Sequence, residues 1–168
     1  SKYSQSNIDQ LFTSQRTVSK TSGLSVQIPN GWHQVDANDS TFIDLWLVEN
    51  NFNASISLMP IHTNMKMETT NLYDYFKYSK VLNKVKFNNN IVISSEDKPY
   101  DINDALAAVY NFTTDQNQYF RVMVFQLNNN FYELTALLDE RLSQNKISKD
   151  ELARIQDYLL ASIKIVQK

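Results

Sequence analysis

The sequence has no cysteine, two glycines and three prolines. The absence of cysteine excludes disulfide bonds, thiolate metal sites and a cysteine nucleophile. Because the glycines are Gly23 and Gly31 alone, the chain lacks the Gly-x-Ser-x-Gly turn of many hydrolases and any glycine-rich phosphate-binding loop. These absences favour a binding protein over an enzyme, so we expect no catalytic residues and no cofactor.

The charge balance gives no reason to expect a nucleic-acid partner. Sixteen Lys and Arg residues against 18 Asp and Glu residues leave a formal net charge of −2, whereas nucleic-acid binding needs clustered basic residues. No apolar run approaches the roughly 20 residues of a membrane-spanning helix. With 42% hydrophobic residues, the chain has enough apolar side chains for a single folded domain over residues 1–168.

The chain starts with polar residues, Ser1-Lys-Tyr-Ser-Gln-Ser-Asn7, and without methionine. Such a start is typical of a mature or truncated N-terminus from which a signal peptide or a lipid-anchored segment has been removed. We therefore expect an exported protein, periplasmic or membrane-anchored, with a flexible extension over residues 1–10. A boundary inside a cytoplasmic protein is the alternative.

The two glycines bracket Leu24–Pro29, where apolar and polar residues alternate. This alternation predicts a strand with one buried face, and Pro29-Asn30-Gly31 predicts a sharp turn before Trp32.

Asparagine runs predict the other turns. Asn50-Asn51 separates residues 42–49 from 52–61, and Asn128-Asn129-Asn130 separates residues 119–127 from 131–138. Short connections of this kind predict antiparallel hairpins. The second pair is apolar on both faces, which indicates helices on both sides of a mostly antiparallel sheet.

Two helices are predicted from capping residues and apolar spacing. The first begins after Thr70 or Asn71 and runs to about Val85. One of its sides carries Leu72, Phe76, Ser79 and Leu82. The second begins after Ser148, which forms a capping box with Glu151. Its apolar residues, which recur at helical spacing, are Leu152, Ile155, Leu159, Ile163 and Val166.

Seven segments carry a resemblance to a known family through their serial order: Gly23–Trp32, Leu58–Ile61, Leu72–Phe76, Ala107–Phe112, Phe120–Phe125, Phe131–Ala136 and Leu159–Ile165. In this order the chain resembles the PsbP-like superfamily, especially its DcrB-type bacterial proteins, some of which are lipoproteins. The resemblance implies an α+β fold: an α/β/α sandwich with a mostly antiparallel central sheet, helices on both faces and the C-terminal helix packed on the sheet. It also implies a non-catalytic accessory role without a shared active site.

Tyr73, Tyr75 and Tyr78 make the first predicted helix unusually aromatic. As an exposed aromatic surface, they are the candidate partner-binding residues of the chain. Packing of the rings in the core, with the hydroxyls reaching water, is the alternative.

The histidines, His33 and His62, are weak metal-site candidates. Asp36 and Asp39 could join His33 around a cation, but solvation of a turn explains these residues better. A metal site needs three or four convergent ligands, and no second histidine stands at helical spacing. We therefore expect no metal site.

Three functions stay open at this point. The first is a non-catalytic, protein-binding accessory protein of the cell envelope, attached to the membrane by a lipid anchor outside this chain or free in the periplasm. The second is an intracellular chaperone or adaptor of the same fold for a secreted effector. The third is a carrier that holds a small hydrophobic ligand between sheet and helix.

Overall fold

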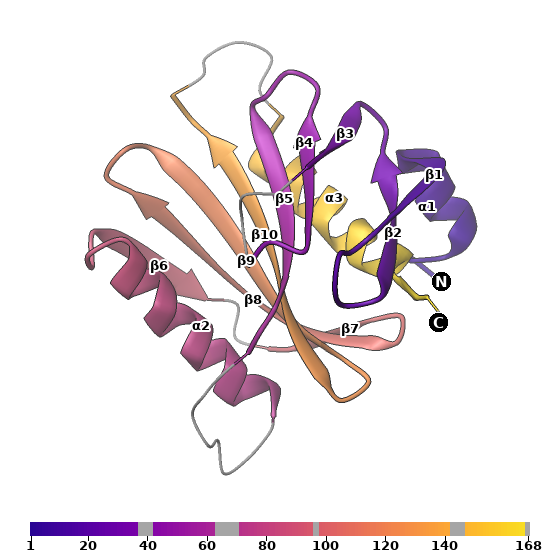
Figure 1. Cartoon of the computed structure of the whole chain (residues 1–168). Coiled ribbons are helices and arrows are strands. Elements are labelled where there is room, and N and C mark those ends of the chain that lie inside the picture. The colour runs from indigo at the N-terminus through magenta and orange to yellow at the C-terminus, as the bar shows by residue number, and fades with distance from the viewer. Residues whose placement is uncertain (37–41, 63–70, 96–97, 142–146, 167–168) are drawn as a thin grey trace.

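A computed structural model describes residues 1–36, 42–62, 71–95, 98–141 and 147–166 (Figure 1). Its elements are α1 (Gln5–Leu11), β1 (Phe12–Val18), β2 (Leu24–Pro29), β3 (Trp32–Val35), β4 (Leu45–Glu49), β5 (Ala54–Pro60), α2 (Leu72–Lys86), β6 (Ile91–Ser95), β7 (Tyr100–Ile102), β8 (Ala105–Thr114), β9 (Gln118–Leu127), β10 (Asn130–Asp139), α3 (Lys149–Ser162) and β11 (Lys164–Ile165).

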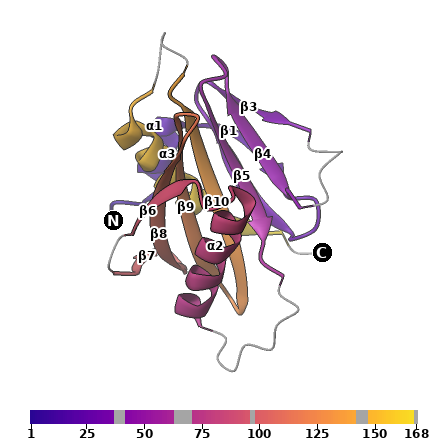
Figure 2. The same ribbon diagram turned by 90° about the vertical axis from the view of Figure 1, so that its left-hand side faces the viewer.

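The strands form a large and a small sheet. The large sheet has the order β3-β4-β5-β10-β9-β8-β6, with β7 also paired to β8, and the small sheet has the order β1-β2-β11. Helix α2 lies on one face of the large sheet, whereas α3, α1 and the small sheet lie on the other (Figure 2). All described strand pairs are antiparallel. The predicted α+β sandwich with helices on both faces is confirmed, and the small sheet is an addition to it.

The predicted hairpin of β9 and β10 lies at the centre of the large sheet. Its strands pair without interruption from Asn130 opposite Leu127 to Asp139 opposite Gln118. The turn contains Asn128 at a positive φ of 51°, a conformation that asparagine adopts at lower cost than most residues. Because both faces of this hairpin carry apolar residues, it separates the core into two clusters.

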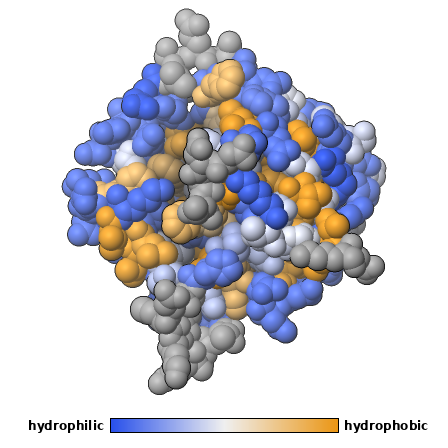
Figure 3. All heavy atoms as spheres, in the orientation of Figure 1, coloured by the Kyte–Doolittle hydropathy of each residue, from blue (hydrophilic) through white to orange (hydrophobic). Residues whose placement is uncertain are grey.

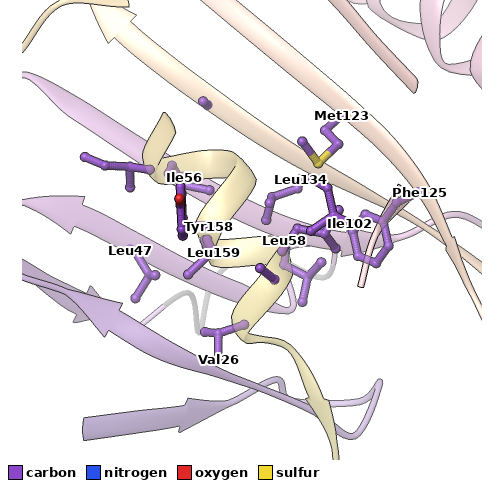
Figure 4. Packing of buried hydrophobic residues seen from close by; sticks show 14 of the residues in the cluster. Val26, Leu47, Ile56, Leu58, Ile102, Met123, Phe125, Leu134, Tyr158 and Leu159 are labelled. Atoms are coloured by element: carbon purple, nitrogen blue, oxygen red, sulfur yellow. The ribbon is translucent and has the colours of Figure 1, made fainter. Parts of the chain in front are cut away.

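The larger cluster fills the space between α3, the small sheet and the large sheet (Figure 4). Leu159 of α3 is fully buried there, as are Leu47 of β4 and Ile56 of β5. The smaller cluster lies under α2, where Phe76 meets Tyr110 of β8 edge to face, with ring centroids 5.5 Å apart. The sheet is therefore packed on both faces along its central strands.

Helix α3 begins as predicted but ends earlier. The Ser148 hydroxyl accepts a hydrogen bond from the Glu151 amide at 3.0 Å, which confirms the cap. The helix ends at Ser162, and Lys164–Ile165 pair with β2 instead. The prediction that Ile163 and Val166 continue the helix is therefore wrong, because the open edge of β2 binds this segment as a strand.

The N-terminal residues pack on the domain, in contrast to the flexible extension expected over residues 1–10. Ser4 caps α1 by accepting a hydrogen bond from the Asn7 amide, and Ile8 is buried in the larger cluster. The Tyr158 hydroxyl of α3 donates to the Lys2 carbonyl at 3.1 Å. In Figure 1 the N-terminal helix α1 and the small sheet with β11 lie on the side of the molecule away from α2, and Figure 2 shows that the two ends of the chain lie apart from each other on that side.

Strand β2 is buried on both faces, where the alternation predicted one buried face. Ser25 and Gln27 are buried as deeply as their apolar neighbours. The Arg16 guanidinium donates to the Ser25 hydroxyl at 2.7 Å, and the side-chain amide of Gln27 donates to Oδ1 of Asp9 at 3.1 Å. Partners distant in sequence thus satisfy the polar face that the pattern assigned to solvent.

We expect Leu159→Ala to lower the free energy of unfolding by about 2–5 kcal/mol, because it leaves a cavity in the fully buried larger cluster. Val92→Thr is the control, since Val92 is exposed and should change stability by no more than about 0.5 kcal/mol. Urea unfolding monitored by circular dichroism measures both values. Equal effects of the two substitutions would contradict the packing of α3 on the sheet.

Candidate partner-binding groove

Helix α2 covers only part of its face of the large sheet. It packs on β8 and β9, and residues 121–125 of β9 are buried without interruption because α3 lies on the opposite face. In β4 and β5, by contrast, buried and half-buried residues alternate, and the second half of β10 shows the same alternation. The helices and strands that the structure describes therefore leave the face of β4, β5 and the far half of β10 open beside α2.

This open face is the floor of a groove of about 550 Å³. Its floor consists of three cross-strand pairs between β5 and β10: Ser55–Leu137, Ser57–Thr135 and Met59–Glu133. The last turns of α2, with Leu82 and Lys86, form one wall, and Trp46 with Ile43 forms the other. Hydrophobic residues lie over the middle of α2 and along the sheet beside it (Figure 3). The serines of β5 on the floor, Ser55 and Ser57, have small side chains between these bulky walls.

Local sequence fixes the position of α2 as predicted. The Asn71 side chain accepts a hydrogen bond from the Asp74 amide at 3.0 Å and begins the helix. Leu72, Phe76 and Ser79 are buried. Leu82, expected on the same buried side, is 45% exposed because it lies at the edge of the groove.

The structure divides the three candidate tyrosines between the two flanks of α2. Tyr75 stacks on Phe131 of β10, with ring centroids 3.9 Å apart and planes 7° apart. Tyr73 is 65% exposed and lies near the Lys77 ammonium, 4.6 Å from its ring centroid. At about 100° per residue, Tyr78 shares the groove flank with Tyr75, whereas Tyr73 lies on the opposite flank. The three rings do not form one surface, and partner binding by them stays a prediction.

A chain of buried hydrogen bonds runs under α2 and ends at the groove floor. The Asn83 amide donates to the Tyr110 hydroxyl at 2.6 Å, and the Tyr110 and Ser79 hydroxyls are 2.5 Å apart. The Ser79 hydroxyl donates to Oε1 of Glu133. Because Ser79 has a single hydroxyl hydrogen, Tyr110 must donate to Ser79, so the chain has one direction and ends on the carboxyl group.

Burial raises the pKa of the Glu133 carboxyl, and the Ser79 hydrogen bond and the Lys86 charge oppose this shift only in part. Burial also raises the pKa of Tyr110, and the negative charge of Glu133 adds to that shift. Tyr110 therefore keeps its proton and stays a hydrogen-bond donor. Ser79 is only 1% exposed, so its hydroxyl lies out of reach of a substrate in the groove.

The groove residues were not among the sequence-predicted candidates. Glu133 is the one charged residue in residues 131–138, a run that is apolar on both faces. A lone carboxyl group in such a strand is the signal that could have indicated it, since charged residues are almost never fully buried without a partner.

The histidine candidates lie apart from the groove. Nδ1 of His33 lies 2.7 Å from the Asn50 side-chain oxygen, and the His33 ring meets Phe52 edge to face. Asp39 lies outside the described residues. Within the described ranges, no three His, Asp or Glu side chains come together as metal ligands. None of the helices described there is long and apolar enough to cross a membrane.

Comparison with known proteins finds similar solved structures but no similar sequences. No family model and no curated protein sequence matches the chain. The structure is similar to the solution structure of cyanobacterial PsbP (CyanoP) from Synechocystis, with a TM-score of 0.60, 15% identity, and coverage of 90% of this chain and 91% of that one. It is also similar to a crystal structure from Bacteroides thetaiotaomicron, with a TM-score of 0.56 and 10% identity over 91% of this chain. This chain spans about half of the Bacteroides chain, 48%.

These similarities show that the fold is PsbP-like. At 15% and 10% identity they carry no further property from one protein to the other. The PsbP-like part of the sequence-based prediction is therefore confirmed at the level of the fold, and the narrower DcrB-type assignment stays a prediction.

We expect Glu133→Gln to stabilise the protein increasingly as the pH rises from about 4 to about 7. In the unfolded chain Glu133 ionises near its ordinary pKa of 4.5, whereas burial resists ionisation in the folded chain. The wild type therefore loses stability as the pH rises past that value, and glutamine does not. Melting temperatures of both proteins across this range measure the effect. A difference in melting temperature that is the same at both ends of the range would contradict the burial of an ionisable group at the groove floor.

Proposed function

We propose that this protein is a non-catalytic accessory protein of the cell envelope, which works by binding another protein in the groove beside α2. The observation that carries this proposal is the incomplete cover of the large sheet. A half-buried sheet face with apolar walls, next to a helix with exposed apolar residues, offers area that a partner can bury.

The width of the open face suits one α-helix. A helix with its side chains is about 10–12 Å across, and neighbouring strands lie about 4.8 Å apart, so one helix covers two to three strands. The open part of the face comprises β4, β5 and half of β10. We therefore assign the groove to an amphipathic helix of the partner, lying beside α2 with its apolar face on the sheet.

Exposed residues of α2 support this occupant. Leu82 is 45% exposed and lines the groove, where a neighbouring helix would contact it. The helix carries four lysines and one acidic residue, Asp74. Lys86 lines the groove itself. A partner helix with acidic residues on the flank that faces α2 would complement this charge.

The envelope location is the expectation that accompanies the PsbP-like resemblance of the chain. An intracellular chaperone of the same fold would use the groove in the same way, for a segment of a secreted client. The two alternatives therefore differ in location and in partner rather than in chemistry.

We expect cell fractionation of the native organism to place the protein with the periplasm or the membranes, because the proposed partner belongs to the envelope. Immunoblots with cytoplasmic and envelope marker proteins measure this distribution. Recovery with the cytoplasmic markers alone would favour the intracellular chaperone.

We expect Ser57→Arg to weaken partner binding at least about tenfold while changing stability by less than about 1 kcal/mol. Ser57 lies half-buried on the groove floor, so a large charged side chain there fills the site without entering the core. A photo-crosslinking residue at Leu137 identifies the partner and its bound segment, and titration of that purified partner gives the affinity.

Val92→Arg is the matched control. Val92 is exposed on β6, and its neighbours Ile91 and Ile93 face α2, so Val92 points to the other face of the sheet. The control should bind the partner like the wild type. A Ser57→Arg protein that binds as tightly as the control, or a crosslinked segment without apolar helical periodicity, would contradict the proposal.

A carrier of small hydrophobic ligands is the second candidate. The groove volume of about 550 Å³ and its apolar walls fall within the ordinary range of ligand sites. Native mass spectrometry of the protein purified from its own organism distinguishes the two: a retained small molecule would favour the carrier, and a mass equal to that of the chain would favour the protein partner.

A further inference from the structure

Glu133 is a buried carboxyl group with an incomplete set of hydrogen bonds. Its side chain lines the groove, although the residue is only 6% exposed. Oε1 accepts the hydrogen bond from Ser79. Among the residues that the structure describes, no donor reaches Oε2. The hydrogen-bond chain from Asn83 thus leaves one carboxyl oxygen for a group that enters from the groove.

On the opposite face of the same hairpin, a buried charged side chain has an ion-pair partner. Arg121 of β9 donates to Asp157 at 3.0 Å and to Gln156 at 2.8 Å, so both α3 and the charge are fixed. Glu133 has no such ion pair within the described part of the chain. A buried carboxylate without a cation is costly, and a cation that reaches it gains a charge-assisted hydrogen bond in a site of low dielectric constant.

We propose that a lysine or arginine side chain of the partner helix binds Oε2 of Glu133 through the groove. This inference rests on the proposed function, since it names the residue type with which the partner is anchored. The aliphatic part of such a side chain fits the apolar approach to Glu133, between Met59 and Leu137 on the floor and Leu82 on the wall. Its charged end then donates a hydrogen bond to Oε2 and forms an ion pair with the carboxylate, as Arg121 does with Asp157.

Lys86 is a lysine of this chain whose charge acts on Glu133. It lines the same groove and lowers the pKa of Glu133, but forms no ion pair with it among the described residues. A partner cation therefore does not have to break a salt bridge in order to bind Glu133. It is only repelled by the positive charge of Lys86. Replacement of Lys86 by an uncharged residue should make the site stronger for a cation.

The experiment uses two probes of equal chain length, n-decylammonium and decan-1-ol, and isothermal titration calorimetry on the whole chain at about pH 9, where an alkylammonium keeps its charge and a carboxyl group of raised pKa is ionised more fully than at neutral pH. We expect the wild type to bind the ammonium about tenfold or more tightly than the alcohol. Glu133→Gln keeps the shape and the Ser79 contact but removes the charge, so both probes should bind it equally. Lys86→Met should increase the preference for the ammonium. Melting curves show that each variant is folded.

Equal binding of both probes by the wild type would overturn the inference, and so would an unchanged ammonium preference in Glu133→Gln. The partner identified by crosslinking at Leu137 provides a second measurement. Replacement of the lysine or arginine in its bound segment by glutamine should weaken binding to the wild type and leave binding to Glu133→Gln unchanged.

The two proposals fail in different ways. If Ser57→Arg leaves partner binding intact while the ammonium preference depends on Glu133, the proposed function fails and the cation site stands. If the partner binds in the groove and Glu133→Gln does not affect it, the proposed function stands and this inference fails. An amine-bearing lipid retained in native mass spectrometry, in place of a bound protein, would overturn the assignment to a partner side chain.

Discussion

The register of the β9–β10 hairpin determines which side chains face each of the two helices. Side chains on a strand alternate between faces, so a shift of one residue would exchange every one of them. In the observed register, Leu134 faces the larger cluster and Glu133 faces α2 and the groove. After such a shift the carboxyl group would lie in the apolar core under α3. The turn at Asn128, with its positive φ, and the pairing of ten residues on each strand hold the register against this exchange.

The hairpin also carries one buried charged group toward each helix. Toward α3, Arg121 meets Asp157 and Gln156, and Gln156 in turn donates to the Leu134 carbonyl at 2.7 Å. These bonds connect the helix to the strands directly. Toward α2, Glu133 accepts a hydrogen bond from the Ser79 hydroxyl, which in turn accepts one from Tyr110. The two faces of one hairpin thus differ in function. On the face toward α3 the buried charge is paired and connects the helix to the strands, whereas on the face toward α2 a carboxyl oxygen stays available at the edge of a groove.

Sequence reasoning succeeded where short-range patterns determine structure. The cap at Ser148, the cap at Asn71 and the hairpin around Asn128 depend on residues within a few positions of each other, and each was predicted. It did not succeed where a distant segment decides the outcome. The apolar spacing continues through Ile163, but the edge of β2 binds the next residues as a strand.

The candidate site was harder to predict than the fold for the same reason. A groove results from what a helix leaves uncovered, and the position of α2 over β8 and β9 depends on the whole of the smaller cluster. The aromatic pattern indicated α2 correctly, yet it could not separate Tyr73 from Tyr75, because the flank that faces the groove is set by neighbours outside the helix. Likewise, Ser57 and Thr135 have no distinctive pattern until β5 and β10 pair.

The location of the chain ends has a consequence for how the groove could be presented to other molecules. Both ends lie on the side of the small sheet, away from α2 (Figure 1), although they are apart from each other there (Figure 2). A flexible tether at either end would therefore attach on the side of the small sheet and leave the groove beside α2 accessible. If a short flexible tether joined the molecule to the assembly that carries its ligand, the effective concentration of the ligand at the groove would reach about the millimolar range. A groove that holds its ligand only weakly in free solution would then be occupied for most of the time.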